Sequence, residues 1–200
     1  MDLSSLKAII HEVRSRTSGR TVLLFGSSSL LASFPNDPPP DIGVEMTLDA
    51  DFFIDPDDLT CRSDLHAYMG INEAYHSKYG YYADFVDLRM ADAFPEGWRD
   101  RLVAMEGFDD VFALDPVDMS VTKVAATARN RLSLRMSRGG KDRGLKDIRT
   151  IVALLKAGKI EWAALQERLR AMDWEPALVV EAGRVMAEIS ERLKADSSAN

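Results

Sequence analysis

Two aspartates, Asp49 and Asp51, interrupt an otherwise apolar segment at residues 47–54 and are the first candidates for chemistry in this chain. Side chains two residues apart in a β-strand point to the same face, so both carboxylates would lie close together. Like charges repel at that spacing unless a cation lies between them. Mg²⁺ or Mn²⁺ takes oxygen ligands from carboxylates and leaves positions for substrate phosphates, so a metal site is one interpretation. An edge strand with its polar face in water is the other.

A glycine turn precedes this pair. Residues 21–25 are apolar, β-branched and aromatic, which predicts a buried strand, and Gly26 and Ser27 follow directly before a predicted helix start. Unpaired backbone N–H groups at such a start suit a phosphate. A plain turn with serine capping explains the same residues.

A third acidic candidate lies on a later predicted strand at residues 81–88, which carries Asp84 and Asp87. Because these two are three residues apart, they would face opposite sides of a regular strand. Only one of them can therefore join Asp49 and Asp51.

Composition places few constraints on function. The chain has 200 residues and a hydrophobic fraction of 46%, enough to bury a core as one domain or two small ones. Its single cysteine, Cys61, and its three histidines show no metal-ligand spacing. With neither a membrane-length apolar run nor a signal-like start, we expect a cytoplasmic protein without a membrane partner.

The net charge of −7 is unevenly distributed. Residues 37–58 contain eight acidic side chains and no basic one, whereas residues 129–149 contain eight basic and two acidic ones. An acidic segment facing a basic one suits a phosphate-handling site. A solvated helix face with a basic loop would give the same count.

Apolar spacing predicts an α+β protein with two parts. We expect an α/β domain over 1–114, a helical domain over 115–195 and a disordered tail at 196–200. Predicted strands cover 21–25, 46–54, 81–88, 102–105 and 111–114. Predicted helices cover 3–16, 64–78, 115–129, 142–156, 161–171 and 176–194.

The order of these pieces resembles the polymerase-β-type nucleotidyltransferase superfamily, in which a Gly-Ser turn, an Asp-x-Asp and a third acidic residue follow one another. Four further segments resemble a little-characterised bacterial family of nucleotidyltransferase-like proteins. More distantly, the chain is similar to abortive-infection-type nucleotidyltransferase toxins of toxin–antitoxin pairs. The four segments are Tyr79-Gly80-Tyr81-Tyr82, Phe94 to Trp98, Asp115 to Lys123 and Lys146-Asp147-Ile148-Arg149.

This resemblance implies a mixed sheet flanked by helices and a role for each candidate residue. Asp49 and Asp51 would bind the divalent ion, and Asp84, with Asp87 in reserve, would orient or activate an attacking hydroxyl. A triphosphate would be bound by three further residues, namely Gly26, Ser27 and Lys123.

The implied activity is transfer of a nucleoside monophosphate from an NTP to a hydroxyl on RNA, protein or a small molecule. Such an enzyme could act as a toxin with an antitoxin partner, and the basic segment 129–149 could bind an RNA acceptor. The alternatives are a catalytically inactive nucleotide- or metal-binding protein on the same fold, and a purely structural module.

Overall fold

The computed structural model describes residues 1–17, 19–37, 39–137, 142 and 144–197. The chain forms two compact units. The first contains Met1–Asp41 and Met46–Pro116, and the second contains Ile42–Glu45 and Val117–Asn200. No helix of the described residues is long and apolar enough to cross a membrane.

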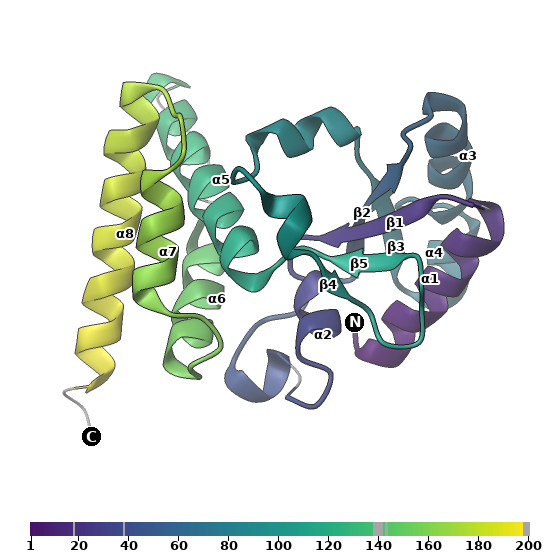
Figure 1. Cartoon of the computed structure of the whole chain (residues 1–200), viewed down its shortest axis with the longest axis horizontal. Helices are drawn as coiled ribbons and strands as arrows, with labels where there is room; N and C mark the ends of the chain where they lie inside the picture. The colour runs from purple at the N-terminus through teal and green to yellow at the C-terminus, as the bar shows by residue number, and fades with distance from the viewer. Residues whose placement is uncertain (18, 38, 138–141, 143, 198–200) are drawn as a thin grey trace. The chain divides into compact units, whose positions relative to one another are not determined.

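The first unit is built on a five-stranded mixed sheet with the strand order β3-β2-β1-β5-β4 (Figure 1). Strand β1 pairs antiparallel with β2 and parallel with β5, β2 pairs parallel with β3, and β4 pairs antiparallel with β5. This sheet and the helical second unit confirm the predicted α+β class. The strands are Thr21–Phe25 (β1), Asp49–Asp55 (β2), Tyr82–Phe85 (β3), Val103–Ala104 (β4) and Val111–Ala113 (β5).

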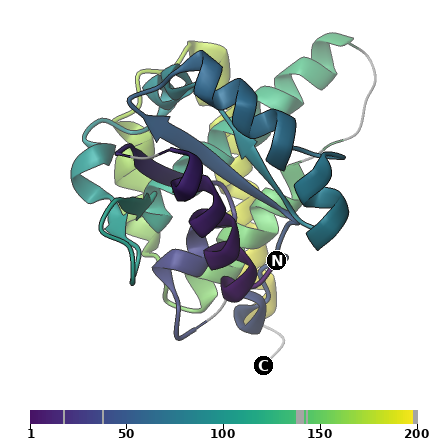
Figure 2. The same ribbon diagram turned by 90° about the vertical axis from the view of Figure 1, so that its right-hand side faces the viewer.

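Three helices cover one face of this sheet, and Figure 2 shows α1 in front of the strands on that side. They are α1 (Leu3–Arg16), α3 (Leu59–Met69) and α4 (Ala74–Tyr79). Helix α1 begins where Asp2 accepts a hydrogen bond from the Ser5 N–H at 2.7 Å. Alternate residues of the strands, such as Leu24, Phe52 and Phe85, are almost fully buried beneath these helices.

A smaller apolar cluster covers part of the opposite face, which carries the odd-numbered residues of β1 and β2. Leu23 and Phe53 are buried there beneath a segment with two 3₁₀ helices, η2 (Leu88–Ala93) and η3 (Trp98–Arg101). The Phe25 and Phe53 rings stack with centroids 4.3 Å apart. The neighbouring positions of β2 and β3 on this face carry the polar residues that the sequence singles out.

The chain between β1 and β2 contains two short helical turns, α2 (Ser29–Ser33) and the 3₁₀ helix η1 (Pro39–Ile42). Part of this connection is rich in proline, which disfavours the interior of a helix. A single 3₁₀ turn forms there because proline is tolerated in the first turn of a helix, where its missing N–H would be unpaired anyway.

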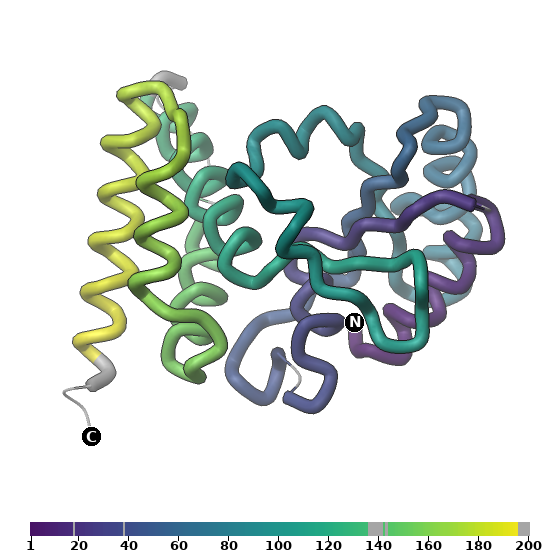
Figure 3. Tube along the Cα trace, viewed as in Figure 1, coloured from purple at the N-terminus to yellow at the C-terminus, as the bar shows by residue number. Residues whose placement is uncertain are grey.

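The second unit contains four helices in the described residues, whose path Figure 3 traces: α5 (Pro116–Ser137), α6 (Gly144–Lys156), α7 (Trp162–Arg170) and α8 (Pro176–Ser197). A buried ion pair joins two of them, because the fully buried Asp118 of α5 accepts a hydrogen bond from Arg168 of α7 at 2.9 Å. Gly144 lies so close to Thr127 that a Cβ atom there would be 2.3 Å from the threonine methyl group. The unit thus has its own apolar core and polar contacts.

Several predicted boundaries were wrong. The single helix expected over 64–78 is two helices, α3 and α4, interrupted at Gly70 and at Asn72, whose φ is +66°. Helix α3 starts earlier than predicted because the Asp58 carboxylate caps it, accepting the N–H groups of Thr60 and Cys61 at 2.9 and 3.2 Å.

The helical half also differs at its ends. Helix α5 continues to Ser137, past the predicted end at Arg129. Helix α8 extends through Ser197, whereas residues 198–200 of the predicted tail lie outside the described residues.

Candidate functional site

The three aspartates singled out by sequence lie on one face of the sheet at adjacent positions. In the parallel pair β2–β3, Asp51 is the register partner of Asp84, and Asp49 is the register partner of Tyr82. Neighbouring strands are about 4.8 Å apart, and register partners point to the same side. Asp49 and Asp51 are half-buried, whereas the Asp84 side chain is 52% exposed. The fold therefore gathers three carboxylates, two from β2 and one from β3.

Tyr82 completes this arrangement as the fourth side chain. Burial raises the pKa of its phenol, and the negative charges of Asp49, Asp84 and Asp51 raise it further. The phenol is therefore neutral at ordinary pH, and all three carboxylates lie close enough to act on it electrostatically. The His76 ring packs against the Tyr82 ring with centroids 5.1 Å apart.

Gly26 lies directly against this group. Its φ of +65° is in the left-handed region, and a Cβ atom there would be 2.2 Å from the Asp51 Oδ2 atom. The antiparallel register that pairs Phe25 with Asp51 explains this close approach. The backbone conformation thus favours glycine at this position, and a side chain there would displace the Asp51 carboxylate.

Ser27 follows Gly26 in a buried turn that leads into α2. Ser27 is only 5% exposed. The hydroxyl groups of two neighbouring serines stabilise the turn. The Ser29 hydroxyl donates to the Gly26 carbonyl oxygen at 2.7 Å, and the Ser28 hydroxyl donates to the Phe25 carbonyl oxygen at 3.2 Å. The predicted order of strand, glycine turn and helix is therefore present beside Asp51.

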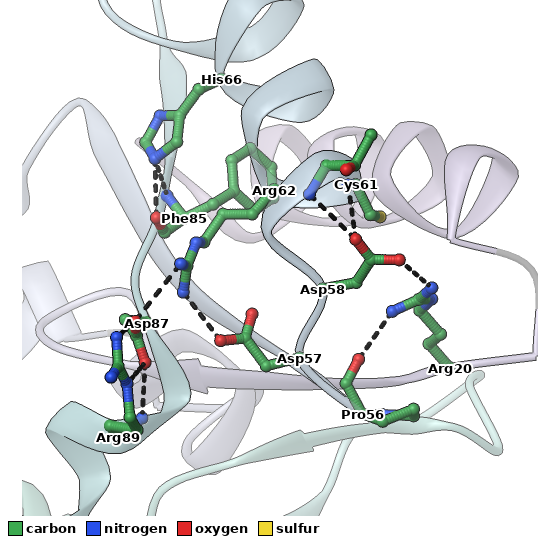
Figure 4. Close-up of polar contacts among 11 residues, drawn as sticks. Arg20, Pro56, Asp57, Asp58, Cys61, Arg62, His66, Phe85, Asp87 and Arg89 are labelled. Atoms are coloured by element: carbon green, nitrogen blue, oxygen red, sulfur yellow. Dashed lines mark hydrogen bonds and ion pairs between the residues drawn. The ribbon is translucent and has the colours of Figure 1, made fainter.

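Asp87, the alternative third carboxylate, lies beyond β3 at the start of η2 (Figure 4). Its carboxylate binds the guanidinium groups of Arg89 and Arg62 at 2.6 and 3.3 Å, and it accepts the Arg89 N–H at 2.9 Å. Hydrogen bonds from Arg89 hold the Asp87 pKa well below its usual range. Geometry thus favours Asp84, which shares its register position with Asp51, as the partner of the Asp-x-Asp pair.

Sequence reasoning missed His66, which contacts this site from helix α3. Its Nε2 atom lies 3.6 Å from the Asp84 Oδ1 atom. The same atom lies 2.6 Å from the Phe85 carbonyl oxygen (Figure 4). The tautomer protonated at Nε2 donates to that carbonyl oxygen. No local spacing in the sequence links residue 66 to residue 84, so only the packing of α3 against β3 reveals this contact.

Lys123 lies on α5 in the second unit, where its ammonium group pairs with the Asp147 carboxylate at 2.5 Å. The lysine side chain is only 11% exposed. Within the second unit it thus forms an ion pair between α5 and α6, and its predicted contact with nucleotide phosphates stays a prediction.

The basic segment 129–149 is partly neutralised within the same unit. Arg131 binds Asp142 and Glu188 at 3.1 and 2.8 Å, and Arg135 binds Glu181 at 3.1 Å. Two other members, Arg129 and Arg149, are exposed to solvent. Of the other four basic positions, Lys146 is half-buried, and those at 138, 141 and 143 lie outside the described residues.

The carboxylate oxygen atoms of Asp49, Asp51 and Asp84 are the kind of ligand that a hard divalent ion binds. Aspartate oxygens are the ligands that Mg²⁺ and Mn²⁺ prefer, and three like charges on one face favour a cation among them. Within the described part of the chain, no group of three or more His, Cys, Asp or Glu side chains has the geometry of a metal site. Because Mg²⁺ is commonly bound by one or two carboxylates plus substrate phosphates, the donor set suits an ion that binds together with a nucleotide.

Comparisons of the chain with protein-family models, with curated proteins and with solved structures gave no significant match. Functional inference therefore depends on the residues and the geometry of this chain.

Proposed function

We propose that the chain is a metal-dependent nucleotidyltransferase, which transfers a nucleoside monophosphate from an NTP to a hydroxyl on RNA, protein or a small molecule. The observation that carries this proposal is the placement of Asp51 opposite Asp84, with Asp49 on the same face and Gly26 against the Asp51 carboxylate. Carboxylates gathered beside a glycine turn supply the groups that phosphoryl-type transfer needs.

Each residue has a defined part in this proposal. Asp49 and Asp51 would hold the divalent ion, which would neutralise the charge of the triphosphate. Asp84 is the most exposed of the three carboxylates, so it is placed to orient the acceptor hydroxyl and to take its proton. The acceptor oxygen forms a bond to the α-phosphorus, the bond to the bridging oxygen breaks, and pyrophosphate leaves.

Two parts of the proposal depend on the resemblance to nucleotidyltransferases. Lys123 would contact the β- or γ-phosphate as a point charge, and the turn at Gly26 and Ser27 would contact the triphosphate. Exposed Arg129 and Arg149 would contact an RNA acceptor through its phosphates. A cytoplasmic toxin with an antitoxin partner is the biological role that this activity would fit.

Transfer is tested by incubating the purified full chain with NTPs labelled at the α-phosphate, Mg²⁺, and pools of RNA and protein. We expect label in one pool, dependence on Mg²⁺, and loss of the label in Asp51→Asn and Asp84→Asn. A matched control is Asp92→Asn, which removes an exposed carboxylate of the same unit and should retain transfer. Label that persists in both site variants would exclude this mechanism, whereas NTP binding without transfer would favour the inactive binding protein.

A further inference from the structure

The second unit contains a cavity of about 550 Å³ that has no part in the proposed transfer step at the carboxylates. One face of α6 lines it, with residues that recur at the three- and four-residue spacing of a helix. Helix α8 and the segment at Ile42 and Gly43 close it. The α6 residues are Arg149, Val152, Ala153 and Lys156, Ala157 follows directly after the helix, and the α8 residues are Arg192 and Ala195.

The polar part of this cavity is cationic. Arg149, Lys156 and Arg192 each contribute a positive charge, and no carboxylate is among its lining residues in the described part of the chain. Glu188 accepts hydrogen bonds from the Arg192 Nε and Nη2 atoms at 3.2 and 2.8 Å, which fixes the orientation of that guanidinium. The same carboxylate also binds Arg131 at 2.8 Å, so a single negative charge is shared between two arginines. The described lining of the cavity thus carries three cationic side chains and no carboxylate.

The rest of the lining is apolar. Val152 is buried, Ile42 and Ala153 are half-buried, and small alanine side chains leave the space between the helices open. An inorganic anion alone would leave this apolar surface in contact with water. A ligand with a planar or apolar body would bury it, and removing such surface from water is favourable.

We propose that this cavity is a binding site for a phosphorylated small molecule of mononucleotide size. Its cations fit a phosphomonoester, since arginine and lysine form charge-assisted hydrogen bonds with phosphate oxygens. Its volume lies within the range of about 300 to 1,000 Å³ that is typical of small-molecule sites. The site is formed by the second unit alone, so the proposal does not depend on transfer at the carboxylates.

The test is calorimetric binding of AMP, inorganic phosphate and adenosine to the purified full chain in EDTA, so that no divalent ion is available to the carboxylates. We expect AMP to bind more tightly than phosphate and adenosine to bind least. The double variant Arg149→Gln with Lys156→Gln should weaken AMP binding by at least about tenfold, because it removes two charge-assisted contacts. Arg129→Gln removes an exposed charge of the same basic segment outside the cavity and should leave binding unchanged.

A second variant tests the cavity without altering its charge. Ala157→Trp places a large ring at an exposed position of the lining and should also abolish AMP binding, while thermal unfolding shows that the unit remains folded. Asp51→Asn should bind AMP normally, which separates this site from the carboxylates. The proposal is overturned if AMP does not bind, if Arg129→Gln weakens binding as much as the double variant does, or if Asp51→Asn abolishes binding.

Discussion

Asp51 and Asp84 are register partners on the parallel strands β2 and β3, so two carboxylates extend from the same face of the sheet at adjacent positions. Asp49 extends from the same face two residues before Asp51 on β2. A sheet gains nothing from like charges placed this way, because directly opposed charges destabilise a strand pair. The arrangement is explained if a divalent ion and a nucleotide bind there.

Nucleotide and metal should stabilise the first unit together. At a concentration about 100 times its dissociation constant, a ligand stabilises by about 2.7 kcal/mol, which corresponds to a rise in Tm of about 5 to 10 °C for a chain of this length. We expect this rise with Mg²⁺ plus a non-hydrolysable NTP, measured by scanning calorimetry. Asp49→Asn should lose it, and Asp92→Asn should keep it. An equal rise in both variants would show that the ligand binds elsewhere.

Gly26→Ala should reduce both stability and transfer. The new methyl group would meet the Asp51 Oδ2 atom at 2.2 Å on a backbone with positive φ, so we expect a loss of roughly 2 to 4 kcal/mol in the free energy of unfolding. Gly107→Ala is the matched control, because Gly107 also has a positive φ but has open space around it. It should lose only about 1 to 2 kcal/mol and keep full transfer. Urea unfolding measures both losses, and equal effects in the two variants would contradict the close approach to Asp51.

Replacing Asp84 should affect transfer, whereas replacing Asp87 should affect stability. Asp84→Asn is expected to abolish transfer with little change in Tm, because its side chain is more than half exposed. Asp87→Asn should lower stability instead, because it weakens the ion pairs with Arg62 and Arg89. Kinetics and calorimetry on both variants separate these outcomes. Loss of transfer in Asp87→Asn alone would reverse the assignment of the third carboxylate.

The depressed pKa of Asp87 also predicts a pH dependence. Because the folded pKa is lowered, its contribution to stability is complete above the unfolded value of about 3.9 and is lost as pH falls toward the folded pKa. The wild-type chain should therefore lose stability more steeply than Asp87→Asn as the solution is acidified below about pH 4. Parallel slopes in urea unfolding at a series of pH values would show that Asp87 has no such role.

Lys123 and Asp147 allow structural and nucleotide-binding roles to be separated. Either Lys123→Gln or Asp147→Asn breaks their ion pair, so each should destabilise the second unit by about 1 to 3 kcal/mol. Only Lys123→Gln removes the ammonium that the resemblance assigns to a phosphate. Its KM for NTP should rise, whereas Asp147→Asn should leave KM near the wild-type value. A rise of equal size in both variants would indicate that Lys123 acts only through the fold.

Local sequence patterns predicted which helices and strands form better than they predicted the residues at which these helices and strands begin and end. The strand Thr21–Phe25 was predicted with its observed bounds because a short apolar run stops at a glycine. The predicted helix began at residue 64, and the earlier start of α3 was missed because it depends on the Asp58 carboxylate, which caps the helix. Helix ends depend on single hydrogen bonds of this kind, which periodicity does not encode.

The sequence predicted which residues form the candidate site but not how they are arranged. The Asp-x-Asp spacing is local, so it places Asp49 and Asp51 on one face without knowledge of the fold. The pairing of Asp51 with Asp84 depends on which strands are neighbours and on their register, and no local pattern decides either. The contact of His66 with Asp84 was missed for the same reason, because it arises from packing between α3 and β3.

The most direct measurement is anomalous diffraction from crystals of the full chain grown with Mn²⁺ and a non-hydrolysable NTP. We predict an anomalous peak at about 2.1 Å from oxygen atoms of both Asp49 and Asp51, with the α-phosphate beside it and the acceptor face open toward Asp84. A nucleotide bound without metal at these aspartates, or a Mn²⁺ peak away from them, would contradict the proposed nucleotidyltransferase site.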